Sequence, residues 1–104
     1  MTKLDSEVQE DILNELKRSF NNLNELGQKT ILKEIGLSKI DIDKIDHDNL
    51  VYEFVNIYTK VLDGLDLDNM DQVDPKYIIV NEYLSGDNKK EFETKQKNYY
   101  LWKN

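Results

Sequence analysis

The chain has 104 residues, no cysteine and a formal net charge of −7. Its length predicts one domain over residues 1–104, and the lack of cysteine excludes disulfides and thiolate chemistry. The negative charge disfavours phosphate backbones and anionic lipids, so we expect neither a nucleic acid nor a membrane as a direct partner. No apolar run approaches the ~18 residues of a membrane span, and the N-terminus lacks a signal-peptide pattern, so we expect a soluble, cytoplasmic protein.

The first predicted helix begins at Ser6 and ends at Gly27. Ser6 and Gln9 fit a capping box, in which each side chain bonds a free backbone amide of the first turn. The apolar residues that follow share one side of a helix: Val8, Ile12, Leu13, Leu16, Phe20, Leu23 and Leu26. Gly27 is placed to close the helix in the left-handed conformation.

Two shorter units follow. A helix is predicted from Gln28 to Ile35, with Gly36 at its end. In the unit Ser38–Asp46, a serine followed three residues later by an aspartate indicates a helix start, although apolar and acidic residues alternate there as in a strand. The pair resembles a helix-turn-helix, but the acids of its second helix would be repelled by DNA. We therefore expect a packing unit or a protein-binding face.

The strongest helical pattern runs from Asn49 to Asp63, with Asp48 as its expected N-cap and Gly64 at its end. Its apolar face is too broad for contact with a single neighbour, so we expect it to be the central helix. The residues after it, Leu65–Val73, read as an acidic connector.

The C-terminal third is ambiguous from Tyr77 onward. Asp74 followed by Pro75 resembles a capped helix start, but the next run is β-branched and short enough to be a buried strand. We predict helices, and therefore an all-α, single-domain bundle of about four to five helices. The alternative is an α+β fold with a C-terminal β-hairpin from about Tyr77 to Trp102.

The net charge lies in the segment Asp41–Asp74, which holds ten acids and two bases, a charge of −8. The other seventy residues hold eleven acids and twelve bases, a charge of +1. Such a local field selects for basic partners. The acids that begin at Asp66 resemble the start of a calcium loop, but residues required later in that loop are missing. His47 is expected to be solvated, and no catalytic constellation is visible, so we predict no enzyme, no cofactor and no metal site.

Aromatic side chains are concentrated near the C-terminus. Tyr99, Tyr100 and Trp102 are expected to be exposed, because three large rings so close together cannot all point inward from one helix. Tyrosine and tryptophan are common binding hot spots.

These features predict a non-enzymatic inhibitor or immunity-type protein that occupies a basic, nucleic-acid-binding surface of a nuclease, toxin or phage-defence effector. Abundant Asn, Lys and Ile are typical of AT-rich genomes, such as those of low-GC bacteria and their phages. The predicted partner-binding residues are Asp63, Asp66, Asp68, Asp71, Asp74, Tyr99, Tyr100 and Trp102. The alternative is a structural or regulatory protein that self-assembles, or joins a replication, transcription or virion complex, through its aromatic C-terminus.

Overall fold

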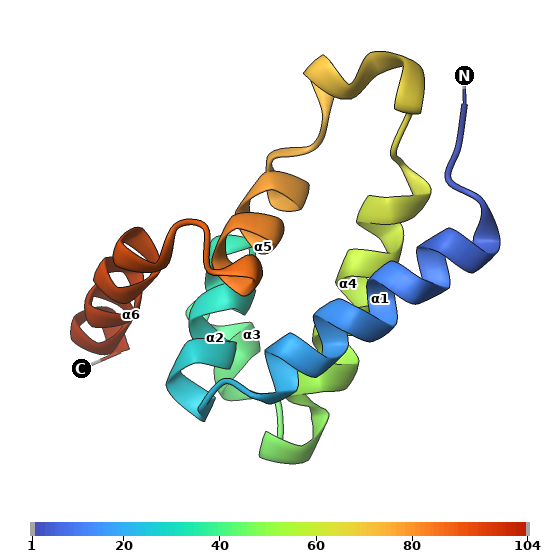
Figure 1. Ribbon diagram of the computed structural model, residues 1–104. Helices are drawn as coiled ribbons and strands as arrows, with labels where there is room; N and C mark the ends of the chain where they lie inside the picture. The colour runs from blue at the N-terminus through green and yellow to red at the C-terminus, as the bar shows by residue number, and fades with distance from the viewer. Residues whose placement is uncertain (1, 104) are drawn as a thin grey trace.

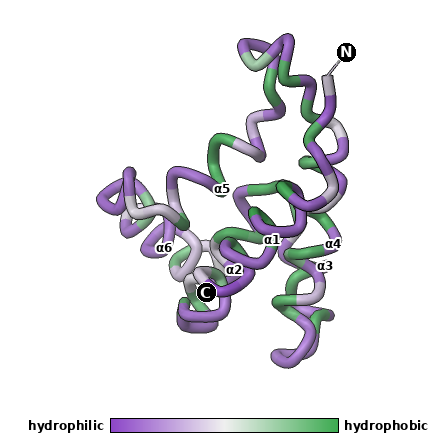
Figure 2. The backbone as a smooth tube through the Cα atoms, turned by 45° about the vertical axis from the view of Figure 1, so that its right-hand side comes forward, coloured by the Kyte–Doolittle hydropathy of each residue, from purple (hydrophilic) through white to green (hydrophobic). Residues whose placement is uncertain are grey.

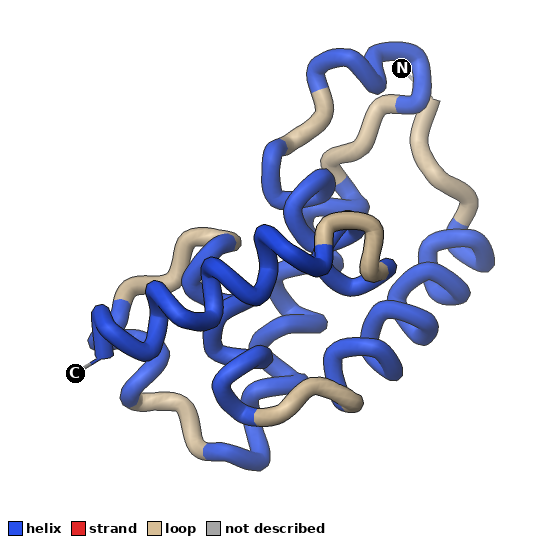
Figure 3. The backbone as a smooth tube through the Cα atoms, turned by 60° about the vertical axis from the view of Figure 1, so that its left-hand side comes forward, coloured by secondary structure: helices blue, strands red, loops and turns tan. Residues whose placement is uncertain are grey.

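The computed structural model describes residues 2–103 and contains only helices and loops in that range (Figure 3). The elements, of which η1 and η2 are 3-10 helices, are α1 (Ser6–Asn21), α2 (Glu25–Glu34), α3 (Lys39–Asp43), η1 (His47–Asn49), α4 (Leu50–Asp63), η2 (Leu67–Gln72), α5 (Pro75–Ser85) and α6 (Lys89–Lys103). The all-α prediction is confirmed. The alternative hairpin is wrong, because α5 and α6 occupy its residues. The expected count of four to five helices is also wrong, since the described residues form six α-helices.

The predicted first helix is two helices. Asp5 rather than Ser6 caps α1, since its carboxylate accepts a hydrogen bond from the Glu7 amide at 2.9 Å. The helix ends at Asn21, and Asn24 starts α2 by accepting from the Gly27 amide at 2.8 Å. The expectation that Gly27 closes a helix is therefore wrong, because it lies in the first turn of α2.

A buried glutamine makes the break between α1 and α2 possible. The Gln28 side chain donates to the backbone carbonyls of Phe20 at 3.1 Å and Leu23 at 3.3 Å. Carbonyls at a helix end have no partner within the helix, so a buried end needs such a donor. Gln28 thus supplies a donor to the Leu23 carbonyl and a second donor to the Phe20 carbonyl, which also accepts from the Leu23 amide at 3.1 Å.

Local signals set the other helix boundaries. Ser38 caps α3 by accepting from the Asp41 amide at 3.2 Å, so this unit is helical and not extended. Asp74 and Pro75 begin α5 as predicted, and Gly86 follows it with a φ of 84°. Asp48 does not cap α4, because it lies within η1 and no side chain caps the first turn of α4.

Helix α4 packs against α1, α2 and α5, and Figure 1 shows it beside α1. Its buried side chains include Leu50, Phe54, Tyr58 and Leu62, all of which are at most 1% exposed. They belong to one hydrophobic core that also takes residues from α1, α2, α3, α5 and α6. Figure 2 shows the contrast between the hydrophobic stretches of α4 and the mostly hydrophilic α6.

The last helix, α6, packs mainly against α2. Among residues 89–102, only Phe92 and Tyr99 are buried. A Cβ atom at Gly27 would lie 3.1 Å from Nε2 of Gln96, so a side chain at this position would require the Gln96 side chain of α6 to shift slightly. None of the helices in the described range is both long enough and apolar enough to span a bilayer.

Candidate functional site

The structure divides the acidic segment Asp41–Asp74 between the two ends of α4. Four of its acids lie in residues 41–48, before α4 begins, and Glu53 lies in the first turn of α4. The other five lie between Asp63, the last residue of α4, and Asp74, the N-cap of α5. In Figure 1 these two regions are at the bottom and the top of the molecule. A helix of 14 residues is about 21 Å long, so the two groups of acids form separate surfaces.

We call the group at the C-terminal end of α4 the acidic end. It consists of predicted partner-binding residues: Asp63, Asp66, Asp68, Asp71 and Asp74. Residues 61–75 contain no lysine or arginine, so no base within the segment offsets these charges. The group is held together because the C-terminus of α4, the whole of η2 and the N-terminus of α5 follow one another in the chain.

Asp66 organises the turn at the acidic end. Its carboxylate accepts hydrogen bonds from the Asn69 side chain at 2.7 Å, the Asp68 amide at 3.1 Å and the Thr2 amide at 3.1 Å. Together these bonds, with that from Asn69 the strongest, hold the pKa of Asp66 below its ordinary value. Asp66 is therefore a structural carboxylate that remains charged in mildly acidic solution.

The N-terminal segment is tied to η2. The Leu67 amide donates to the Thr2 carbonyl at 2.7 Å, and the Thr2 hydroxyl donates to Asp68 at 2.8 Å. Sequence reasoning missed this contact, because the partners are more than sixty residues apart and neither carries a motif. The tie fixes the backbone that presents the acids.

Three of the other acids differ in the hydrogen bonds that their carboxylates accept. Asp63 accepts from the Gln9 side chain at 2.7 Å, and Asp74 accepts from the Lys76 amide at 2.9 Å as the N-cap of α5. Asp71 is exposed. All three nevertheless lie at the surface, so their charges face solvent.

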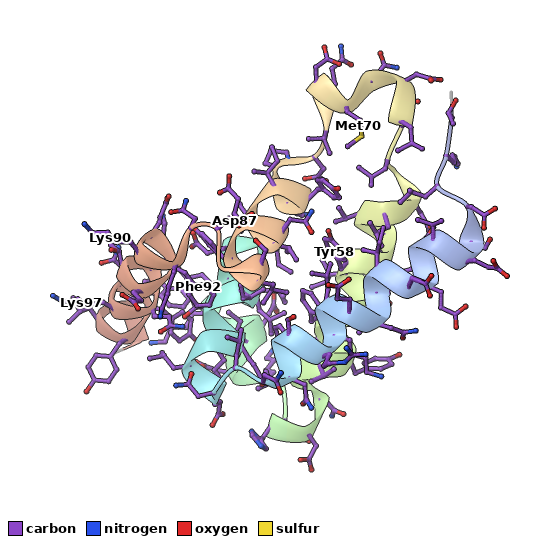
Figure 4. All side chains as sticks on the ribbon, viewed as in Figure 1. Tyr58, Met70, Asp87, Lys90, Phe92 and Lys97 are labelled. Carbon is purple, nitrogen blue, oxygen red and sulfur yellow. The ribbon has the colours of Figure 1, made fainter. Side chains whose placement is uncertain are left out.

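Two apolar side chains lie among these carboxylates. Both lie on η2, where Leu67 is 42% exposed and Met70 is 39% exposed. Figure 4 labels Met70. Sequence reasoning assigned them no role, although their placement between aspartates was visible. Exposed apolar side chains ringed by charge are typical of protein-binding surfaces.

The aromatic C-terminus is only partly exposed. Tyr99 is fully buried, so the expectation that its side chain is exposed is wrong. Its ring lies 5.3 Å from that of Trp102, between centroids, and points into the core from the α2 side of α6. Tyr100 is 57% exposed. Tyr99 is therefore a core residue, and Tyr100 is the tyrosine available to a partner.

Trp102 is partly covered by cations. The Nζ atoms of Lys33 and Lys39 lie 5.0 and 6.0 Å from its ring centroid. Such cation–π contacts join the end of α6 to α2 and α3. The preceding residue in the chain, Leu101, is 63% exposed. The end of α6 thus combines apolar surface with positive charge.

His47 lies at the opposite end of α4 from the acidic end. Its Nδ1 atom is 3.9 Å from a carboxylate oxygen of Glu25, and both side chains are exposed. Within residues 2–103, no group of three or more His, Asp or Glu side chains is arranged to hold a metal ion.

No protein-family model, curated protein or solved structure matches this chain.

Proposed function

We propose that this protein works by binding, without catalysis, and that its acidic end occupies a basic surface of another protein. The observation that carries the proposal is that five surface aspartates and exposed Leu67 and Met70 share residues 63–74, around a turn that the Thr2 contacts hold in place. A fixed backbone reduces the ordering cost of association. The backbone of this surface is therefore preorganised for binding.

The charges favour a partner that normally binds nucleic acid. Carboxylates spaced along a turn present negative charge to lysine and arginine side chains as phosphates do, and complementary fields accelerate encounter. Burial of Leu67 and Met70 would add the desolvated centre that charge alone does not provide. Such a binder acts as a stoichiometric inhibitor, and its targets would be nucleases, toxins or phage-defence effectors.

The test uses two variants with equal changes of charge at opposite ends of α4. In D63K/D71K the acidic end is altered, whereas D46K/D48K alters the other group of acids and serves as the control. Immobilised protein is exposed to bacterial lysate at about 50 and about 300 mM salt, since exposed charge pairs are screened over this range. Each captured protein is then purified and its affinity for wild type and both variants is measured.

The proposal predicts a basic, nucleic-acid-binding protein whose affinity falls at higher salt. D63K/D71K should weaken binding by at least tenfold and D46K/D48K by less than threefold. The captured protein should also release its nucleic acid when wild type is added. Equal affinities of the two variants, or a partner that keeps its nucleic acid, would refute the proposal.

A second candidate function is self-assembly through the end of α6. The specific observation is that Tyr100 and Leu101 are each more than half exposed beside the partly exposed Trp102. Assembly through apolar surface would be homotypic and nearly independent of salt. Sedimentation equilibrium of wild type and Y100S/L101S distinguishes the candidates, because only this second function predicts an oligomer that the double substitution dissociates.

A further inference from the structure

Helix α5 carries large apolar side chains on more than one side. Val80 and Tyr83 are buried, Tyr77 and Leu84 are half-buried, and Ile78 on another side is 44% exposed. Large apolar side chains of a helix normally pack against a neighbouring element. Ile78 is therefore less covered by neighbouring residues than the other apolar side chains of α5.

A groove shared with α1 is lined by the half-buried Tyr77 and Leu84 of α5. The groove has a volume of about 330 Å³ and its apolar lining residues are Ile12, Leu16, Tyr77 and Leu84. The volume lies at the lower end of the ~300–1,000 Å³ range of ligand sites, enough for a few large side chains.

One edge of α1 provides a continuous wall for this groove. Ile12, Glu15 and Ser19 line it at spacings of three and four residues, which place them on one side of the helix. Val8, four residues before Ile12, extends the same side and is 46% exposed. The apolar strip is thus longer than the cavity itself.

The polar rim of the groove is acidic. Three carboxylates line it: Glu15 on α1, Glu82 on α5 and Asp87 just after α5. Asp87 is labelled in Figure 4, and the lining includes no lysine or arginine. None of the three forms an ion pair with a described residue. The Glu82 carboxylate accepts a hydrogen bond from the Asn88 side chain at 3.5 Å, whereas none of the described residues bonds the carboxylates of Glu15 and Asp87. A cationic ligand would therefore reach the latter two without displacing a partner.

We propose that the groove between α1 and α5 binds an amphipathic helix of a partner protein, with apolar residues at i, i+4 and i+7 and lysine or arginine on its flanks. Apolar side chains at that spacing insert along a groove between two helices, and flanking cations meet the rim. None of the five aspartates of the acidic end lines this groove, so it is a different site from the surface proposed above.

The probe is a fluorescein-labelled peptide of 16 residues, with leucine at the stated spacing and lysine and alanine elsewhere. Its affinity is measured by fluorescence anisotropy in about 150 mM salt, which screens non-specific attraction. Ser19→Trp fills the groove from α1, and no hydrogen bond of the Ser19 side chain is lost. Asn14→Trp, on the exposed side of α1, is the matched control. E15K/E82K tests the rim, and D63K/D71K tests whether the peptide binds the acidic end instead.

We expect micromolar binding that S19W weakens at least tenfold and E15K/E82K at least fivefold, with N14W and D63K/D71K within twofold of wild type. A peptide of the same composition with its leucines scattered around the helix should bind at least tenfold more weakly. Equal affinities for S19W and N14W, or for both peptides, would overturn the proposal. So would a peptide-free dimer that S19W dissociates, because the occupant would then be a second copy of this chain.

Discussion

Phe20 of α1 and Phe54 of α4 are stacked face to face, with ring centroids 4.3 Å apart and planes inclined by 7°. The Tyr58 ring continues the stack one turn along α4, at 5.8 Å and 8° from Phe54. All three side chains are fully buried. The stack therefore fastens the N-terminal helix to the central one and sits at the middle of the core.

Replacing Phe54 by alanine should lower the free energy of unfolding by about 3–5 kcal/mol, because it leaves a cavity between two buried rings. Tyr52→Ala is the matched control on the same helix, since Tyr52 is 68% exposed, and it should change stability by less than about 0.5 kcal/mol. Urea denaturation followed by circular dichroism measures both. Similar losses in the two variants would show that the stack is not central to the core.

The Tyr99 hydroxyl is buried and has no hydrogen-bond partner among the described residues. Burial raises the pKa of Tyr99, so the group stays neutral. Tyr99→Phe removes this unsatisfied group and keeps the ring, so it should leave stability unchanged or raise it by about 1 kcal/mol. Tyr99→Leu, which loses the ring as well, should be destabilising.

Trp102 gives a second measurement for these variants. It is the single tryptophan of the chain and lies beside Tyr99, so its fluorescence reports whether α6 is docked. Tyr99→Phe should keep the native emission maximum. A loss of stability above about 1 kcal/mol in Tyr99→Phe would mean that the hydroxyl makes a bond in solution.

The parts of the fold that were predictable are those governed by local side chains. Ser38 caps α3, Asp74 and Pro75 start α5, and Gly86 takes the left-handed conformation after it. Each of these residues acts on backbone within a few positions, so the sequence pattern contains the whole interaction.

The break between α1 and α2 was not predictable in this way. Apolar residues keep helical spacing through Leu26, but Gln28 supplies hydrogen bonds to the end of α1 only when the chain has already turned. Gly27 was misread for the same reason, since it lies in the first turn of α2, beside the Gln96 side chain of α6. Contacts across the fold outweighed the local periodicity.

The candidate site was predicted in composition and not in shape. The acids of residues 63–74 do share one end of the molecule. The hydrogen bonds of Thr2 with Asp66 and Asp68, however, could not be predicted from any sequence motif. The side of α6 that is buried depends on how that helix meets α2, and this places Tyr99 inside and Tyr100 outside. A helix with few apolar residues carries too weak a pattern to set that orientation.

The tie between Thr2 and η2 should loosen in acid. The folded pKa of Asp66 is below its ordinary value of 3.8, so the charged carboxylate stabilises the fold above that value. This contribution is lost as the pH falls through the folded pKa. An NMR titration should therefore show the Thr2 amide and the Asn69 side-chain amide shifting together, with a midpoint below 3.8.

Asp66→Asn is the control for this titration. It keeps an acceptor oxygen but removes the charge, so the shared midpoint should disappear and the Thr2 amide should exchange faster with solvent at neutral pH. A midpoint at or above 3.8 in the wild type would show that the hydrogen bonds to Asp66 are not formed in solution.

Gly64 and Gly86 each follow a helix, yet substitution by alanine should have opposite effects. Gly86 has a φ of 84°, which costs an L-residue about 1–2 kcal/mol, so Gly86→Ala should be destabilising although nothing lies within 4 Å of its new Cβ. Gly64 has a φ of −87° and a ψ of −2°, which alanine adopts without strain. The nearest atom to its new Cβ is the Lys60 carbonyl oxygen, at an ordinary 3.6 Å.

Gly64→Ala should therefore raise the free energy of unfolding by about 0.4–1 kcal/mol, because it restricts the unfolded chain without straining the folded one. Gly86→Asn separates backbone strain from other causes, since asparagine tolerates the left-handed conformation better than alanine and should recover part of the loss. Urea denaturation of the three variants and the wild type measures the free energy of unfolding. It should decrease in the order Gly64→Ala, wild type, Gly86→Asn, Gly86→Ala. If both alanine variants moved stability in the same direction, the left-handed turn between α5 and α6 would not be the conformation in solution.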